Sequence, residues 1–312
     1  MTSPPFSATA IGSLNQPIIM TSSKSNTVAR RSLLATLALG VLSVFSHTAA
    51  AQEAKKPEWN GYEIQNFKVD GRDGLMVLPK TPAPGKPWIW RTEFFGIDPQ
   101  ADIALLGKGF HVAYVGIGGL YGAPVALDAM DKFYDYAVKT YSVNPKVVLE
   151  GFSRGGLYAL NYGIRHPERV ASMYLDAPVC DFRSWPGGGA GSQGRMVKMY
   201  GREWAECLRA YNLNEEQARA YKGNPIDNLA PLAKAKIPIF IVCGDMHDWV
   251  VPIEGNSLVV EKRYKELGGE VVVIRKPKGG HRPHSLPDPT PIVDFIVKHA
   301  PAAAGAKPAG VK

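Results

Sequence analysis

Cysteine is scarce in this sequence, because its 312 residues include only Cys180, Cys207 and Cys243. An odd number of cysteines excludes a complete disulfide framework, and the spacing of these three matches no metal-binding motif. In an oxidising compartment, Cys180 and Cys207 could pair across the segment between them. Cys243 ends an apolar run, and we predict that it is a buried thiol.

Long runs of positive charge are also missing. The chain has 36 basic and 28 acidic residues, and three basic residues but no acidic ones precede Gln52. From Gln52 onward, 33 basic residues therefore face 28 acidic ones, and the excess is spread along the chain. This composition does not indicate a nucleic-acid-binding protein. We likewise find no grouping of side chains that predicts a bound metal or cofactor.

The N-terminal apolar run, 33–45, is too short to span a bilayer stably. Arg30 and Arg31 precede it and three alanines at 49–51 follow it, an order typical of a cleaved secretory signal peptide. The paired arginines also match a twin-arginine signal. We expect residues 1–51 to be leader and signal peptide, and the mature protein to be periplasmic or secreted without stable membrane association. An uncleaved membrane anchor is the alternative.

Glycine and proline are plentiful, with 32 and 25 residues, and they separate many short apolar runs. Two strand-like runs around a turn come first, and strand-like runs then alternate with helical patterns. This order predicts one α/β domain over residues 58–299, with a mostly parallel, twisted sheet flanked by helices. We expect strands at 62–69, 75–78, 87–95, 110–117, 147–149, 171–175, 237–242 and 271–274, and helices at 101–107, 124–141, 156–165, 255–267 and 291–299.

One sharp turn carries the strongest chemical signal. The aliphatic run that begins at Val147 stops at Gly151-Phe152-Ser153-Arg154-Gly155 and continues into a helical pattern. A serine in such a turn has a strained backbone, so the residues two before and two after it must be small. Gly151 and Gly155 meet that requirement. The pattern resembles the nucleophile elbow of the α/β-hydrolase family, in which the serine is the nucleophile.

A serine nucleophile needs a base within hydrogen-bond reach and an acid that orients this base. The resemblance places the acid in a loop after a late strand, where Asp248 fits best and Asp245 is the alternative. It places the base after the last strand, where His281 follows two glycines and His284 is the competitor. The order Ser153, Asp248, His281 agrees with the triad order of this fold.

As a whole, the chain resembles exported bacterial proteins related to prolyl-oligopeptidase-like and carbohydrate-esterase-like hydrolases. The resemblance spans 62–299 and rests on Gly-Phe-Ser-Arg-Gly-Gly and on segments 224–229 and 283–286. It implies that 180–228, which interrupts the alternation with helical patterns at 196–211 and 215–221, is a helical lid; surface decoration is the alternative. Residues 300–312, rich in Ala, Pro, Gly and Lys, are expected to be a disordered tail.

Acyl transfer also requires donors for the developing oxyanion, and the first is expected to be the backbone N–H of Arg154. The loop that supplies the second donor in this family lacks the usual His-Gly-Gly here, so we assign this role to Thr92 or Arg91. The Arg154 side chain could bind a substrate carboxylate or hydroxyl, or form an ion pair with Glu93. The further candidates for contact with substrate are Trp185, Trp249 and His284.

These residues predict an exported serine hydrolase that cleaves carboxylic esters through an acyl-enzyme. Acyl esters of saccharides or of aromatic acids are the expected substrates. Two alternatives are a peptidase of the prolyl-oligopeptidase type and an inactive binding protein on a hydrolase scaffold. The sequence leaves the oligomeric state open.

Overall fold

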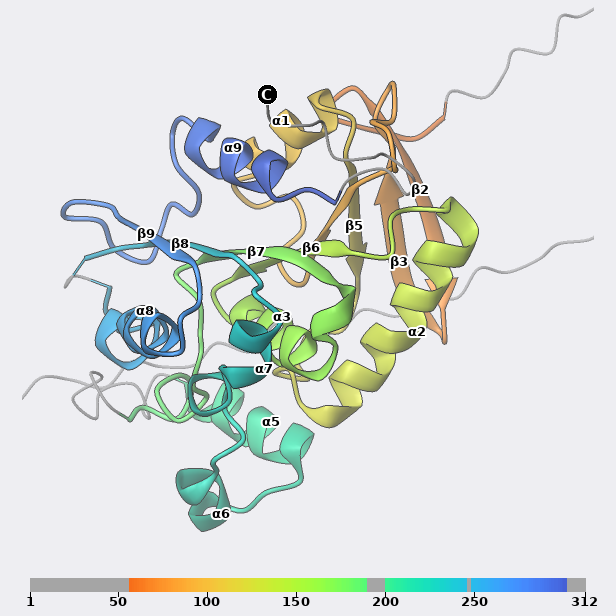
Figure 1. The fold of residues 1–312 in the computed structure, drawn as a ribbon. Helices are drawn as coiled ribbons and strands as arrows, with labels where there is room; N and C mark the ends of the chain where they lie inside the picture. The colour runs from red at the N-terminus through yellow and green to blue at the C-terminus, as the bar shows by residue number, and fades with distance from the viewer. Residues whose placement is uncertain (1–55, 190–199, 246–247, 302–312) are drawn as a thin grey trace, which may run out of the picture. The chain divides into compact units, whose positions relative to one another are not determined.

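The computed structural model describes residues 56–189, 200–245 and 248–301. Within these ranges a nine-stranded sheet has the order β1-β2-β3-β5-β4-β6-β7-β8-β9 (Figure 1). The strands β1 to β3 pair antiparallel, and β4 to β9 pair parallel with one another. The strands are β1 (Glu58–Trp59), β2 (Tyr62–Val69), β3 (Arg72–Val77), β4 (Trp88–Arg91), β5 (His111–Val115), β6 (Val147–Phe152), β7 (Val170–Asp176), β8 (Ile239–Cys243) and β9 (Val271–Arg275).

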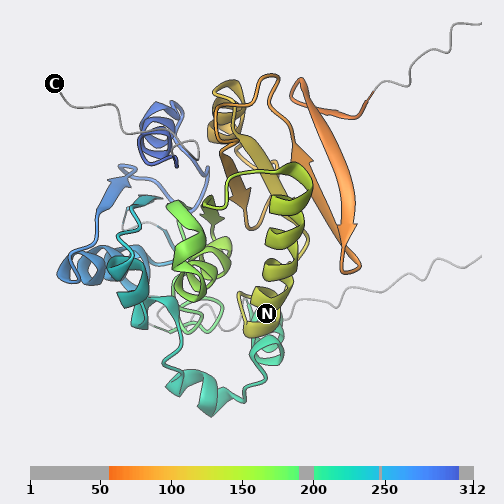
Figure 2. The same cartoon turned by 45° about the vertical axis from the view of Figure 1, so that its right-hand side comes forward.

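Helices cover both faces of this sheet. In Figure 1, α1 and α9 lie on one side, and α2, α3, α7 and α8 lie on the other. The view in Figure 2 agrees, and α1 contacts α9 while α3 contacts both α2 and α7. The helices are α1 (Gln100–Gly107), α2 (Pro124–Tyr141), α3 (Gly155–Arg165), α5 (Gly201–Tyr211), α6 (Glu215–Ala220), α7 (Ala230–Lys234), α8 (Ser257–Glu266) and α9 (Thr290–Lys298), with short 3₁₀ turns η1 (Pro167–Arg169), η2 (Pro225–Asp227) and η3 (Ile253–Gly255).

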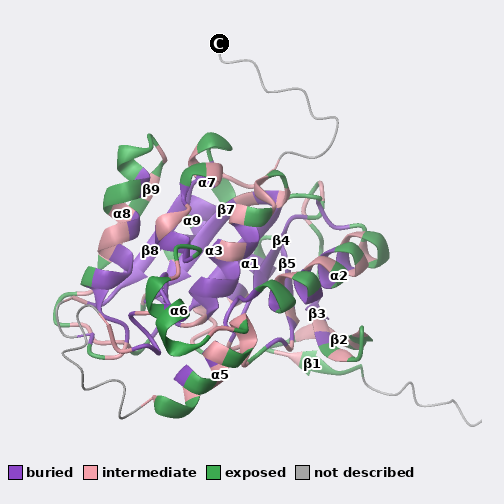
Figure 3. Ribbon diagram, turned by 90° about the horizontal axis from the view of Figure 1, so that it is seen from below, coloured by how far each residue is buried: buried purple, intermediate pink, exposed green. Residues whose placement is uncertain are grey.

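The alternation of side chains along each strand divides the core into two layers. Trp88 and Trp90 of β4 belong to the layer under α2 and α3, whereas Ile89 belongs to the layer under α1 and α9. Leu149 and Val148 of β6 divide in the same way. Figure 3 shows the middle of the sheet as buried and exposed residues on the outer sides of the helices. The apolar runs of the sequence are continuous because both faces of these strands are covered.

The first hairpin is confirmed, and its turn is tighter than expected. Asp70 and Gly71 both have positive φ, 51° and 76°, as a two-residue type I′ turn requires. The return strand therefore begins at Arg72, not at residue 75. The strand expected at 87–95 is too long, because β4 ends at Arg91 and the chain turns away at Phe94, where φ is 55°.

The interruption between β7 and β8 contains α5 and α6, which have their own small apolar cluster. Trp185, Trp204, Phe182 and Tyr121 are buried there together. This cluster joins the interruption to the loop after β5, which carries Tyr121. Residues 190–199 and the start of the helix expected at 196 lie outside the described residues, and the lid role stays a prediction.

The predicted signal peptide at 1–51 and most of the predicted tail, from residue 302 onward, also lie outside the described residues. Among the helices that are described, none combines the length and the apolar character needed to cross a membrane.

Gly156, the second residue of α3, permits close packing of this helix on the chain after β7. A Cβ added there would lie 2.6 Å from Cβ of Pro178 and 2.7 Å from the carbonyl oxygen of Val179. We expect Gly156→Ala to lower the free energy of unfolding by about 1–3 kcal/mol, because backbone atoms cannot yield as flexible side chains do. Gly201→Ala is the matched control, since a Cβ on Gly201 meets no atom within 4 Å. Equal denaturant midpoints for the two variants would contradict the prediction.

Candidate active site

The predicted elbow joins β6 to α3, and Ser153 and Arg154 lie between them. Its φ is 50°, a left-handed conformation that is strained for a serine. A Cβ on Gly151 would lie 2.8 Å from the carbonyl oxygen of Gly155, so only glycine allows strand and helix to pass this closely. The backbone N–H of Ser153 donates to the carbonyl oxygen of Asp176 at the end of the neighbouring strand, β7.

Ser153, His281 and Asp248 form one chain of hydrogen bonds. Nε2 of His281 lies 2.9 Å from Oγ of Ser153, and Nδ1 lies 3.1 Å from Oδ2 of Asp248. Because an ionised carboxylate only accepts, Nδ1 carries the proton and Nε2 is left to accept from the serine hydroxyl. This tautomer is the one a general base requires. Asp248 is buried, and its Oδ1 accepts from the N–H groups of Val250 and Val251.

Asp245, the alternative acid, has a different place. One of its carboxylate oxygens accepts from the backbone N–H of Lys278, and its own N–H donates to the carbonyl oxygen of Gly279. These bonds tie the loop after β8 to the loop after β9. Asp245 therefore holds together the two loops that carry Asp248 and His281.

The structure corrects the assignment of the second oxyanion donor. The side chain of Arg91 has no exposed surface and binds Asp102 and the carbonyl oxygen of Ile97. Thr92 is equally buried. Its N–H donates to the carbonyl oxygen of Glu150, and its hydroxyl donates to the carbonyl oxygens of Glu150 and Gly155. Neither residue can therefore reach a substrate oxyanion. The sequence did not reveal this, because nothing in it shows how deeply the end of β4 is covered.

Arg91 instead belongs to a buried charged group beneath the elbow. Its guanidinium lies 4.1 Å from the ring centre of Phe152 and 3.8 Å from a carboxylate oxygen of Glu150. Burial, together with the negative charge of Asp102, raises the pKa of Glu150 well above its ordinary value. These contacts lie on the side of the sheet that faces α1, and they stabilise β6, the strand that ends directly before Ser153.

Arg154 forms the ion pair with Glu93 that the sequence offered as one of its two roles. Its Nη2 lies 3.2 Å from a carboxylate oxygen of Glu93, and its guanidinium lies 5.1 Å from the ring centre of Phe94. The Arg154 side chain is 26% exposed, so it is the part of this pair open to solvent. Burial raises the pKa of Glu93, although the positive charge of Arg154 opposes this effect.

The remaining substrate-contact candidates lie in three different environments. Trp185 is buried in the apolar cluster near α5, with its ring centre 6.1 Å from that of Tyr121. Trp249 is 64% exposed directly after Asp248. His284 is almost fully buried and hydrogen-bonded to Asp176, so it is not placed to contact substrate. Asp176 was missed, although an aspartate at the carboxyl end of a parallel strand is a recognisable signal.

The three cysteines are all buried free thiols, so the possible pairing of Cys180 with Cys207 is not present in the structure. No group of three or more His, Cys, Asp and Glu side chains within the described part of the chain has an arrangement that could hold a metal ion.

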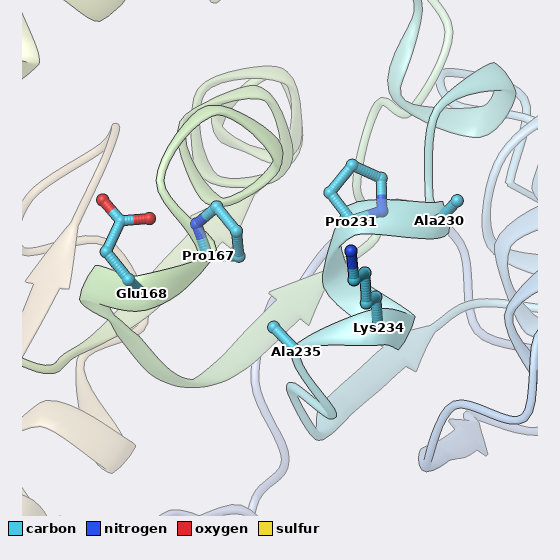
Figure 4. Close-up of a pocket in the computed structure, with 6 residues that line it drawn as sticks. All are labelled: Pro167, Glu168, Ala230, Pro231, Lys234 and Ala235. Carbon is cyan, nitrogen blue, oxygen red and sulfur yellow. The ribbon is translucent and has the colours of Figure 1, made fainter.

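A surface hollow of about 740 Å³ lies between η1 and α7, away from Ser153, His281 and Asp248 (Figure 4). It is lined by two prolines, two alanines, Glu168 and Lys234, and no member of the Ser153 hydrogen-bond chain reaches it. The lining contains no serine, cysteine or histidine, so this hollow is not part of the Ser153 site.

No protein family and no curated protein matches the sequence. Solved structures do match. Acylaminoacyl peptidase of Pyrococcus horikoshii aligns with a TM-score of 0.58 and 13% identity over 80% of this chain and 43% of its own. Dipeptidyl peptidase 4 of Porphyromonas gingivalis aligns with a TM-score of 0.57 and 17% identity, over 78% of this chain and 36% of its own. A putative lipase of Acinetobacter baumannii aligns with a TM-score of 0.50 and 17% identity over 76% and 90%.

This chain thus spans less than half of the length of the two peptidases. Similarity at such low identity shows shared architecture. The sheet order, the helices on both faces and the elbow between β6 and α3 agree with it. The chain therefore has the α/β-hydrolase fold.

Proposed function

We propose that the protein is a serine hydrolase that cleaves carboxylic esters. The observation that carries this proposal is the hydrogen-bond chain in which His281 lies 2.9 Å from Oγ of Ser153 and 3.1 Å from Asp248. The same chain with the same tautomer activates serine in hydrolases of unrelated folds.

In the proposed reaction, Oγ of Ser153 attacks the ester carbonyl carbon while Nε2 of His281 takes the hydroxyl proton. The carbonyl oxygen becomes an oxyanion, which the N–H of Arg154 stabilises. The C–O bond to the alcohol then breaks, and His281 returns its proton to that alcohol. Water, deprotonated by His281, hydrolyses the acyl-enzyme and releases the acid and free Ser153.

Labelling with a fluorophosphonate probe tests this proposal directly. The wild-type protein should react, and mass spectrometry of its peptides should locate the adduct on Ser153. A protein that fails to react under conditions in which it is folded would support the inactive binding scaffold instead.

A peptidase is the second candidate, because two of the similar structures are an acylaminoacyl peptidase and a dipeptidyl peptidase. The kcat/KM values for p-nitrophenyl acetate and for a blocked peptide p-nitroanilide separate the two. The ester substrates that we propose include acyl esters of saccharides and of aromatic acids. We also propose export through residues 1–51; full-length protein found only in the cytoplasmic fraction would argue against it.

Arg154 is proposed to bind a carboxylate or hydroxyl of the substrate with the exposed side of its guanidinium. Arg154→Met should raise KM for esters that carry such a group by about 10-fold or more, because a charge-assisted hydrogen bond contributes about 1.5–3 kcal/mol. For p-nitrophenyl acetate, which has neither group, KM should stay near the wild-type value. Arg165→Met at the other end of α3 is the matched control, since Arg165 pairs with Asp128 on α2. Equal KM changes with both kinds of ester would argue against this role.

A further inference from the structure

A second aspartate–histidine pair lies directly behind the first. Nδ1 of His284 is 2.8 Å from Oδ1 of Asp176, and the backbone N–H of Ser285 donates to Oδ2 at 2.7 Å. The hydroxyl of Tyr174 lies 3.1 Å from the same oxygen, and Nζ of Lys276 lies 3.9 Å from Oδ1. Neither member of this pair takes part in the proposed reaction.

Asp176 touches both halves of the catalytic apparatus. Its main-chain carbonyl oxygen accepts the N–H of Ser153 at 2.9 Å, and its carboxylate holds the loop that carries His281. One residue at the end of β7 therefore connects the backbone of the nucleophile to the loop of the base. A shift of this loop relative to β7 would have to break charge-assisted hydrogen bonds.

The imidazole of His284 is packed between the two groups it connects. Its ring centre is 5.0 Å from that of Phe152, the residue before the nucleophile, and 5.0 Å from that of His281. The side chain is only 1% exposed, so a substrate cannot touch it. Any effect of His284 on the reaction must therefore pass through its neighbours.

Further hydrogen bonds hold this loop, and a hollow borders it. A hollow of about 520 Å³ lies against the loop, lined among others by Pro277, Pro283, His284 and Leu286. Two further hydrogen bonds reach the loop near this hollow. The backbone N–H of His284 donates to Asp98, and Nζ of Lys276 donates to the carbonyl oxygen of Pro283.

We propose that Asp176 and His284 are a positioning pair, which holds Nε2 of His281 in line with Oγ of Ser153. The proposal rests on the proposed function, because it assigns a task to residues behind the same triad. It follows from the strict geometry of proton transfer: a displacement of about 1 Å can cost on the order of 100-fold in rate.

Two substitutions of His284 separate its hydrogen bond from its packing. His284→Phe keeps a ring between Phe152 and His281 but removes the donor to Asp176. His284→Asn keeps a donor near the position of Nδ1 but removes most of the ring. With p-nitrophenyl acetate we expect kcat of His284→Phe to fall by about 100-fold with KM unchanged, and His284→Asn to recover most of the loss.

His111→Asn is the matched control, because His111 is another buried histidine and lies on β5, away from the loop. Its substitution should lower the melting temperature without lowering kcat. Unchanged kcat in His284→Phe, or a kcat loss in His111→Asn of the same size, would overturn the positioning role. So would an equal kcat loss in His284→Phe and His284→Asn.

A second measurement does not depend on turnover. The Nδ1 proton of His281, bonded to Asp248, should give a ¹H resonance far downfield of the amide protons. We expect this resonance in the wild-type protein and in His284→Asn, and its loss in His284→Phe. If no ester is hydrolysed but the resonance follows this pattern, the proposed function fails while the positioning pair stands; if the resonance persists in His284→Phe, the positioning pair fails.

Discussion

Replacing Ser153 with alanine is expected to lower kcat for p-nitrophenyl acetate by on the order of 10⁴- to 10⁶-fold. In the proposed reaction His281 deprotonates the Ser153 hydroxyl, whose Oγ lies 2.9 Å from Nε2, and alanine has no group to take its place. The substitution should also abolish labelling by a fluorophosphonate probe. The free energy of unfolding should not fall, because alanine keeps the packing around the elbow and leaves no buried donor unpaired.

Ser172→Ala is the matched control for this experiment. Ser172 is fully buried on β7, beside the nucleophile strand, and its hydroxyl has no hydrogen-bond partner among the described residues. Its loss should leave both kcat and labelling at the wild-type level. Retained turnover or labelling in Ser153→Ala would rule out Ser153 as the nucleophile.

Asp248→Asn is expected to lower kcat by about 10⁴-fold. The two carboxylate oxygens of Asp248 accept from three N–H groups, those of His281 Nδ1, Val250 and Val251. An amide has only one oxygen, so its NH₂ must face a donor. If the oxygen remains with the two backbone N–H groups, the NH₂ faces Nδ1 and favours the tautomer in which Nε2 carries the proton. That tautomer cannot take the proton of Ser153.

Asp245→Asn distinguishes the two candidate acids. Asp245 binds the N–H of Lys278, and the carboxylate that Nδ1 of His281 meets is that of Asp248. The Asp245→Asn variant should therefore lose far less kcat than Asp248→Asn, and its main effect should be on the stability of the two loops. A larger loss of kcat in Asp245→Asn than in Asp248→Asn would reverse the assignment of the acid.

Local signals in the sequence accounted for the elements of the fold with small errors at their ends. The helix expected at 124–141 has these bounds in the structure, because its apolar face, its proline at the first position and its end are all encoded nearby. β6 is longer than the expected 147–149 because its last residues pair with β7, which the strand's own sequence does not show. The short β1 and α7 were missed, since elements of this length have little periodicity.

The candidate site divides in the same manner. Ser153, Asp248 and His281 were selected from turn chemistry and from their positions after strands, and the structure brings these three side chains together. The sequence could not predict the burial of Arg91 and Thr92, because it depends on how α1 and α3 cover them. Cys180 and Cys207 could be counted, but only the structure shows them as free thiols.

By itself, the sequence determined the α/β architecture, the elbow and the order of the three residues that meet at it. These features depend on local preferences, such as glycine in a tight turn and apolar periodicity, which neighbouring residues specify. Tertiary structure alone decided which polar groups are buried and which partners several of them have: Arg91 with Asp102, and Asp176 with His284. The physical reason is distance along the chain, since Asp176 and His284 are 108 residues apart and meet only because parallel strands bring their carboxyl ends to one edge of the sheet.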